Sequence, residues 1–399
     1  MITRFRVKNY KCLGYVDFPL TPIHVIIGQN DSGKTSVLEA MCAMSKSTSC
    51  NNISEIFPGD WKGCELLNKS SDLNIIELDI FVDHIESDVN INLEYCLKLE
   101  VDESHIRCKV FAEFMNRYDS SGKIVESIVL SPKRTDISAL ANRMDYPSVS
   151  SERKTLIIVA DELYRSTYLT FNPSIMSVAS SFDVWRKFSM DTDGFGLPTL
   201  LDDILSYDPL LYMKIKEEFC DFFPQFKAVR IETEEGLKKQ IDRSGSITFS
   251  KSIGKGLYFD TKSGTSIRAE QVSDGAILFL GFLALMYNPK PPKLIMIEEP
   301  EKGIYPKRLE EVIGMMRKLV ENPGDRPVPQ IVMTTHSPYF LSLFQPEEVT
   351  FLRREGGTGP VRAYPMRDAP HIHERLGNGS FYLGELWYNL TEEELFADG

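Results

Sequence analysis

The sequence predicts an α/β fold built around a phosphate-binding loop, with an antiparallel β subdomain and an inserted helical region. Three observations predict it. An apolar run at 23–27 leads into a Gly-rich loop, and a segment of helix-forming residues follows that loop. Apolar and polar residues then alternate between 75 and 112, as in strands with one buried face. The region 176–226 contains a helix start signal, and we expect it to form a small helical insertion.

The bulk composition is that of a protein with a hydrophobic core. The 399 residues suffice for two or three domains, and 42% of them are apolar while 26% are charged. The longest apolar run, 276–287, is shorter than the roughly 20 residues that span a bilayer, and the N-terminus lacks a signal-peptide core. We therefore expect a cytoplasmic protein that does not associate with a membrane.

Cysteine content and charge argue against further classes. The seven cysteines contain no Cys-x-x-Cys pair, which argues against a zinc site and against a secreted disulfide framework. A formal charge of −12 disfavours a protein coated in nucleic acid, although it is compatible with a local basic patch. Arg4, Arg6, Lys8 and Lys11 form one basic cluster. These residues either touch a nucleotide or nucleic acid or lie on a solvated strand face, and we favour the second interpretation.

The first elements lead to the phosphate loop. We expect strands at 3–7, 15–18 and 23–27, then the loop GQNDSGKTS and a helix over 36–44. Glycines let backbone N–H groups converge on phosphate oxygens, and the positive end of the following helix points to the same place. The order of strand, loop and helix is the one that a nucleoside triphosphate site requires. The ordinary alternative is a Gly-rich turn that matches the pattern by chance.

The loop fits the pattern G-x-x-x-x-G-K-[ST], which assigns roles to its residues. Lys34 should reach the β- and γ-phosphates of ATP, and Thr35 should offer its hydroxyl to Mg²⁺. The expected ATP-binding residues are Gly28, Asn30, Gly33, Lys34, Thr35 and Ser36. The loop indicates a triphosphate and leaves open what is done with it.

The middle of the chain is interpreted from alternation and caps. The antiparallel subdomain should contain strands at 75–82, 91–101 and 106–112. Asp208-Pro209 combines a capping carboxylate with proline at the first helical position, and the helix should run to about 223. Strands should return at 246–249 and 256–259. We expect three ranges: 1–175 with the loop and the β subdomain, the insertion 176–226, and the remaining core 227–399.

A Mg²⁺ site requires an acidic residue at the end of a buried strand near the strand of the loop. Two apolar runs qualify, one ending in Asp161-Glu162 and one ending in Glu298-Glu299. We choose the second because of its neighbours. Ser273-Asp274-Gly275 opens an apolar helix before it, and a strand after it, 330–335, leads to His336.

With this order of phosphate loop, serine–glycine signature, acidic strand and histidine, the sequence resembles the ATP-binding-cassette (ABC) ATPase heads of the P-loop NTPase fold. Within them it is similar to the group that includes RecF and the overcoming-lysogenization-defect (OLD) proteins. The segments 302–306 and 383–387 look like stretches of stand-alone members. Recognisable motifs cover about 1–45 and 265–390, and the middle of the chain matches no motif.

The resemblance implies roles for the acidic residues and the histidine. Glu298, where the family more often has Asp, would hold the water shell of Mg²⁺ together with Thr35. Glu299 would align or deprotonate the attacking water, and His336 would contact the γ-phosphate, so these two are the expected catalytic residues. The ordinary alternatives are a solvated helix cap for the two carboxylates and a core position for the histidine.

The resemblance also implies a dimer. Ser273, Asp274 and Gly275 would bind the γ-phosphate held by the opposite subunit. One chain carries one loop and one signature, so two chains would close head to tail around ATP as a homodimer, alone or within a higher homo-oligomer. The signature is VSDGA rather than the commoner LSGGQ, and the charge of Asp274 near phosphate would weaken closure or slow turnover. In the ordinary alternative these residues are only an N-cap.

The favoured function is an ATP-hydrolysing dimer switch that controls a separate effector protein, such as a nuclease or toxin, or a nucleic acid, in bacterial anti-phage defence. One alternative is a RecF-like ATPase of DNA repair and maintenance. Another is a slow-turnover ATP sensor that holds a toxin or nuclease as a scaffold.

A nuclease activity of this chain is not expected. OLD proteins carry a metal-dependent Toprim nuclease domain behind the histidine. In this sequence the only aspartates after His336 are Asp368 and Asp398. The Asp-x-Asp metal pair of that domain is therefore missing. We interpret His371, His373 and Glu374 as exposed residues rather than as metal ligands.

Overall fold

The computed structural model describes residues 1–57, 64–86, 89–102, 107–130, 134–182, 187–241, 247–321, 328–357, 359–369, 372, 376 and 382–389. The chain divides into two compact units. Unit 1 contains 1–167, 293–296 and 330–399, and unit 2 contains 168–292 and 297–329. The boundaries of these units differ from those of the three ranges expected from the sequence, 1–175, 176–226 and 227–399. The three ranges stay a prediction.

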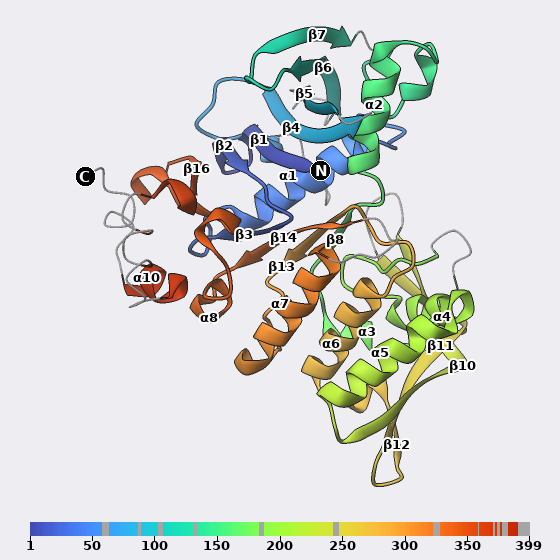
Figure 1. The fold of residues 1–399 in the computed structure, drawn as a ribbon. Helices are drawn as coiled ribbons and strands as arrows, with labels where there is room; N and C mark the ends of the chain where they lie inside the picture. Colours follow the sequence, from blue (N-terminus) through green and yellow to red (C-terminus); the bar gives the residue numbers. More distant parts are fainter. Residues whose placement is uncertain are drawn as a thin grey trace. The chain divides into compact units, whose positions relative to one another are not determined.

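The described residues form one sheet of twelve strands, in the order β7-β6-β5-β4-β1-β2-β16-β15-β3-β14-β13-β8 (Figure 1). These strands are β1 Ile2–Tyr10, β2 Leu13–Pro19, β3 Ile23–Ile27, β4 Ile75–Glu86, β5 Val89–Asp102, β6 Arg107–Tyr118, β7 Ile124–Leu130, β8 Thr167–Leu169, β13 Leu294–Glu298, β14 Gln330–Thr335, β15 Val349–Arg354 and β16 Val361–Pro365. Strands β8 and β13 begin in unit 1 and end in unit 2.

The sheet combines two kinds of pairing. Strands β7, β6, β5, β4, β1 and β2 are antiparallel neighbours, which confirms the predicted antiparallel strands. Strands β14 and β15 both run parallel to β3, the strand that precedes the loop. On β4 the side chains of Ile76, Leu78, Ile80 and Val82 are at most 1% exposed, so the alternation in the sequence marks a buried face. The antiparallel strands are thus a continuation of the sheet that carries the phosphate loop.

The helices of unit 1 include α1 Lys34–Lys46, α2 Ser151–Glu162, α8 Pro338–Leu341 and α10 Leu383–Asn389. Ser150 caps α2, because its hydroxyl accepts from the backbone N–H of Arg153. Asp161 and Glu162 therefore end a helix and not a buried strand. The rival pair therefore does not meet the stated requirement, and the assignment of Glu298 and Glu299 stays a prediction.

Unit 2 contains helices and a second sheet of the order β10-β9-β11-β12, in which β10 also pairs with β11. Its strands are β9 Ser180–Ser181, β10 Phe226–Ile241, β11 Ile247–Thr261 and β12 Ser266–Arg268. Its helices are α3 Pro173–Met176, α4 Leu197–Tyr207, α5 Pro209–Phe222, α6 Asp274–Met286 and α7 Pro306–Glu321. Short 3-10 turns in the two units are η1 Ile53–Glu55, η2 Cys64–Leu66, η3 Arg143–Asp145, η4 Ala269–Gln271, η5 Pro346–Glu348, η6 Glu355–Gly357 and η7 Met366–Asp368.

One strand prediction in this region was wrong. The two strands expected at 246–249 and 256–259 are a single strand, β11, which pairs with β10 along its length. Gly254 lies in its middle, where the backbone of β9 approaches so closely that a Cβ would lie 2.3 Å from the carbonyl oxygen of Ser180. The glycine thus marks a close contact between strands inside β11 and not the end of a strand.

The predicted helix start at Asp208-Pro209 is confirmed. The carboxylate of Asp208 accepts from the backbone N–H of Leu210, Pro209 is the first helical residue, and α5 ends at Phe222. Phe222 stacks on Phe279 of α6 with ring centroids 3.7 Å apart, and the guanidinium of Arg308 lies over Phe222 at 4.0 Å. Aromatic packing therefore holds the helices of unit 2 together. In the described part of the chain, no helix is both long and apolar enough to cross a membrane.

Candidate nucleotide site

The phosphate loop connects β3 to α1 in unit 1. All five residues of β3 are buried, and backbone φ angles of 156° at Gly28 and 88° at Gly33 require glycine. A Cβ on Gly28 would lie 2.6 Å from the carbonyl oxygen of Leu352, and one on Gly33 would lie 2.9 Å from Cys12 Sγ. The two motif glycines are therefore fixed by the local geometry.

Polar groups converge inside this loop. Lys34 is 8% exposed, and its Nζ donates to the carbonyl oxygens of Gly28 and Gln29, each at 2.8 Å. The Ser32 hydroxyl is buried and has no hydrogen-bond partner among the described residues. Gly33 caps α1 without a side-chain hydrogen bond. An ammonium, an unpaired hydroxyl and a helix N-terminus at one place fit the triphosphate of a nucleotide.

The other predicted loop residues lie at the surface. Asn30 and Thr35 are exposed, and Ser36 is half-buried with its hydroxyl 3.6 Å from Cys12 Sγ. Thr35, at the start of α1, could offer its hydroxyl to a metal ion. These positions agree with the predicted roles but do not test them.

Arg354 of β15 supports the loop, and no local sequence pattern indicates this contact. Its Nε donates to the carbonyl oxygen of Asp31 at 2.9 Å, and its Nη1 donates to that of Gly359 at 3.3 Å. Asp31 has a φ of 62°, a left-handed conformation that costs energy in a non-glycine residue. Arg354 stabilises this turn through the parallel pairing of β15 with β3.

His336 lies at the same edge of the sheet as the loop. Strand β14 is parallel to β3, with Thr335 opposite Ile27. Strand β14 ends one residue before His336, and β3 ends one residue before Gly28. The side chain of His336 is exposed. The core position considered for this histidine is therefore wrong. Its contact with a γ-phosphate stays a prediction.

The acidic pair lies at the end of β13, in unit 2. Glu298 is the last residue of the strand, and its Oε2 accepts from the Tyr168 hydroxyl at 3.0 Å. Glu299 has a φ of 47° and forms an ion pair with Lys302, whose pKa is raised because its ammonium donates to this carboxylate. A cavity of about 140 Å³ is lined by both carboxylates, Lys302, Thr170, Phe171, Leu278 and Pro300. The strand end thus presents two oriented carboxylates to a cavity the size of a few water molecules.

The predicted signature also lies in unit 2, at the start of α6. Ser273 is the exposed N-cap residue, and its side chain makes no capping hydrogen bond. A Cβ on Gly275 would lie 2.9 Å from the carbonyl oxygen of Gly303, and one on Gly303 would lie 2.8 Å from Leu278 Cδ1. The loop behind the acidic pair therefore packs closely on the first turn of α6.

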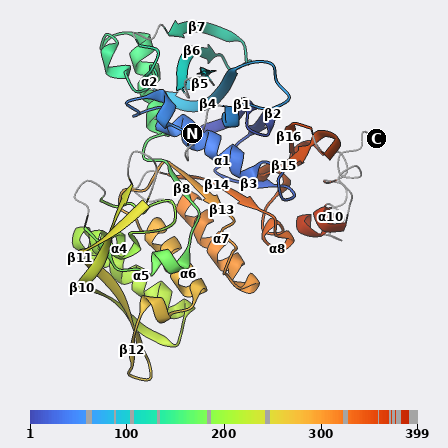
Figure 2. The same cartoon turned by 180° about the vertical axis from the view of Figure 1, so that it is seen from behind.

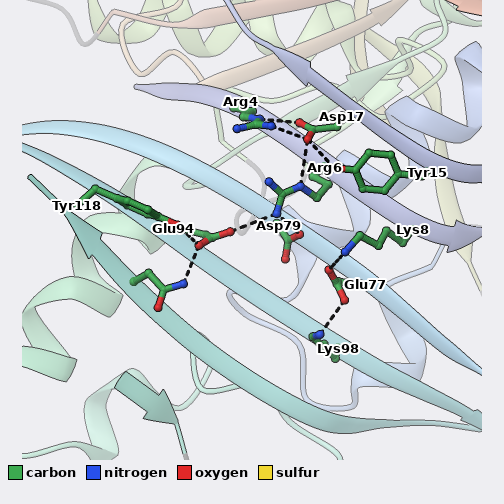
Figure 3. A network of polar contacts seen from close by, with 11 residues as sticks. Arg4, Arg6, Lys8, Tyr15, Asp17, Glu77, Asp79, Glu94, Lys98 and Tyr118 are labelled. Atoms are coloured by element: carbon green, nitrogen blue, oxygen red, sulfur yellow. Dashed lines mark hydrogen bonds and ion pairs between the residues drawn. The ribbon is translucent and has the colours of Figure 1, made fainter. Parts of the chain in front are cut away.

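The basic cluster pairs with acids of its own sheet. Arg4 donates to Asp17 at 2.6 Å, Lys8 to Glu77 at 2.5 Å and Lys11 to Glu39 at 2.5 Å. Arg6 lies between the carboxylates of Asp17, Asp79 and Glu94 (Figure 3). These pairs favour the interpretation as a strand face over a site for nucleotide or nucleic acid.

Glu77, Asp79 and Cys96 form a group whose possible ligand atoms lie within 4.8 Å of one another. Lys8 and Lys98 already hold the carboxylate of Glu77, and Arg6 holds Asp79. Burial raises the pKa of Asp79 to about 6. This shift disfavours the ionised carboxylate, which is the form that binds a metal ion. The group is therefore a poor metal site. His371, His373 and Glu374, interpreted above as exposed, lie outside the described residues.

The fold is similar to that of a solved Smc head domain. The structure described as "Crystal structure of the SmcHead bound to the C-winged helix domain of ScpA" has a TM-score of 0.53 and 13% identity, and the match covers 94% of this chain and 99% of that chain. An Smc head with an extended coiled coil, bound to the C-terminal domain of ScpA derived from Pyrococcus furiosus, has a TM-score of 0.48 and 11% identity over 94% of this chain and 99% of that one. The first of these matches shows that this chain has the fold of an Smc head domain, with the phosphate loop between β3 and α1.

The chain belongs to a family of AAA-type ATPase domains. Residues 128–342, more than half of the chain, match the family described as "AAA domain, putative AbiEii toxin, Type IV TA system", and residues 1–194 match an "AAA ATPase domain". An OLD nuclease from Thermus scotoductus is 46% identical over 41 residues, which are 10% of this chain and 8% of that protein. These matches confirm the resemblance to OLD-like ATPases. The chain spans only a small part of the length of this curated relative.

Proposed function

We propose that this protein is an ATP-hydrolysing switch. The observation that carries the proposal is the phosphate loop, in which two sterically fixed glycines, the Lys34 ammonium and the buried Ser32 hydroxyl converge at the start of α1. Lys34 binds the β- and γ-phosphates, and the exposed His336 at the same sheet edge contacts the γ-phosphate. Both groups increase their interaction as charge moves onto the phosphate oxygens.

The acidic pair supplies the remaining groups of the proposed reaction. Thr35 and Glu298 would hold Mg²⁺, which would neutralise charge on the phosphates when bound. Glu298 is oriented by Tyr168, and Glu299 aligns the attacking water or takes its proton.

In the proposed closed state two copies meet head to tail. Ser273, Asp274 and Gly275 of one copy complete the ATP site of the other. Two features support this: Ser273 and Asp274 are exposed, and the Ser273 hydroxyl is not used for capping. Hydrolysis then opens the dimer.

The output of the switch is proposed to be the control of a separate effector, a toxin or nuclease, or of a nucleic acid, in the cytoplasm and in anti-phage defence. The family description, which includes a toxin, and the short match to an OLD nuclease support this direction. A RecF-like role in DNA maintenance and a slow-turnover scaffold are the alternatives.

The test compares wild type with Glu299→Gln in steady-state phosphate release and in light scattering with ATP. We expect the variant to hydrolyse ATP about 10²- to 10⁴-fold more slowly and to accumulate as an ATP-bound dimer. Glu310→Gln, an exposed carboxylate on α7, is the matched control and should behave as wild type. A Glu299→Gln variant with wild-type turnover, or one that binds ATP as a monomer, would contradict the proposal.

A further inference from the structure

The terminal strand β7 is an exposed edge of the large sheet. It ends the strand order, its one partner among the described strands is β6, and both views show it as the outermost arrow of this sheet (Figures 1 and 2). Val125 is 58% exposed and Val129 is 77% exposed. Proteins usually protect such edges with lysine, proline or several charges, whereas β7 contains one charged residue, Glu126. An edge of this kind is a surface for strand pairing.

The sequence of β7, IVESIVL, is nearly symmetric about Ser127. An antiparallel second copy centred on Ser127 places Ile124 opposite Leu130 and Val125 opposite Val129. Glu126 then faces Ile128, and the two Glu126 side chains avoid direct opposition, which would be destabilising. Ser127 faces its own copy. One register therefore matches apolar residues on both faces of the strand pair.

We propose that β7 pairs with β7 of a second copy of this chain and joins the two sheets edge to edge, without a requirement for nucleotide. A second copy fits better than a different protein, because only a two-fold contact makes use of a symmetric strand. Such a contact is closed, so it covers both edges and leaves none for further addition at this site. The low charge of β7 also suits the self-association of a chain with a net charge of −12.

The contact is small and is therefore weak by itself. A pair of seven-residue strands buries less than the roughly 1,000 Å² expected of a stable interface. Alone it gives a weak association that grows with protein concentration, and it can also link copies that associate in another way, such as the proposed ATP-closed dimer. The pairing does not depend on that dimer, because β7 is remote in sequence from the loop, the acidic pair and the signature.

Cysteine cross-linking without nucleotide tests the register. Ser127→Cys should form an intermolecular disulfide under mild oxidation, because each Ser127 lies opposite its own copy. Val125→Cys alone and Val129→Cys alone should not exceed wild type, which carries the native cysteines, but a mixture of these two variants should cross-link. Ser127→Cys at the wild-type level would overturn the proposal, and so would Val125→Cys cross-linking to itself as fast as Ser127→Cys does.

A second measurement uses sedimentation at increasing protein concentration. Val129→Lys replaces the apolar partner of Val125 with a charged side chain and should weaken nucleotide-free self-association at least tenfold, whereas Val149→Lys, at an 87% exposed position outside β7, should leave it unchanged. The ATPase rate of both variants should equal that of wild type, so this result is separable from failure of the proposed switch. Equal self-association of Val129→Lys and wild type would reject the contact.

Discussion

Lys34 is the residue on which nucleotide affinity should depend most strongly. Its ammonium is buried in the loop and donates to two loop carbonyls. Lys34→Ala removes the positive charge that the phosphates require, and we expect ATP affinity to fall at least 100-fold. Calorimetric titration with ATP measures this loss. Lys46→Ala, at the exposed last turn of the same helix, should bind like wild type, and a Lys34→Ala variant that also did so would exclude the loop as the ATP site.

Lys302 should restrain the carboxylate proposed to act on water. It forms an ion pair with Glu299 while its own side chain is 72% exposed. Lys302→Met removes this ion pair, leaves the Glu299 carboxylate free to act on water and should raise the turnover of ATP. Because exposed ion pairs are weak, we expect an increase of only about twofold to fivefold.

Phosphate release at saturating ATP measures the effect of Lys302→Met, with Lys307→Met on the exposed start of α7 as control. A fall in turnover comparable to that of Glu299→Gln would instead make Lys302 part of the reacting machinery.

For single residues, the sequence predicts those of the motifs but not the side chains that hydrogen-bond to them. Spacing identifies Gly28, Gly33 and Lys34, because these residues form one short contiguous motif. Tyr168 and Arg354 contact Glu298 and Asp31 from positions 130 and 323 residues away along the chain. Pairing between distant strands creates these contacts, and no local pattern indicates which tyrosine or arginine will arrive there.

At the scale of elements, two glycines should respond in opposite ways to the same substitution. A Cβ at position 254 of β11 meets the backbone of β9, which cannot easily move, so Gly254→Ala should lower the free energy of unfolding by about 1–3 kcal/mol. Gly314 lies inside α7 with nothing within 4 Å of the added Cβ, and Gly314→Ala should raise it by about 0.5–1 kcal/mol. Urea unfolding of both variants measures the contrast. Equal effects at the two positions would mean that β9 does not pack there as described.

The elements themselves follow the sequence where a local signal exists. Alternation gives β4 and β5, and the Asp208-Pro209 cap gives the start of α5, since these signals act within a few residues. The apolar run ending at Glu162 has the sequence pattern of a buried strand, but it forms a helix. Ser150 caps the start of this helix. Gly254 lies inside β11 because β9, which is distant in sequence, packs against it. Local sequence patterns therefore do not predict that β11 is a single strand.

For the stability of the whole molecule, His24 should be a main source of acid sensitivity. It lies on β3, fully buried, with Nε2 2.9 Å from Thr350 Oγ1. Burial, with Arg367 nearby, lowers its pKa to about 3 from 6.5. Between these values the unfolded chain binds a proton that the folded chain does not, so the contribution of His24 is present above pH 6.5 and is lost as the pH falls. The loss between pH 7 and pH 5 is about 2 kcal/mol.

Thermal unfolding at pH 7 and pH 5 tests this expectation. His24→Gln should be less stable than wild type at pH 7, because a buried hydrogen bond and a ring stacked on Phe18 are lost, yet it should lose less stability on acidification. His84→Gln, at a half-buried position on β4, should keep the wild-type dependence on pH. An unchanged pH dependence in His24→Gln would show that other groups cause the sensitivity.

The polar face of the large sheet has a consequence for how this protein can change over generations. Arg6 shares its charge among Asp17, Asp79 and Glu94, and Glu94 also accepts from Asn116 and Tyr118, so one network crosses five strands (Figure 3). Replacing any one member leaves buried partners unsatisfied, whereas exchanging several together does not. Substitutions at these positions should therefore occur together, and related sequences should keep or replace the network as a set.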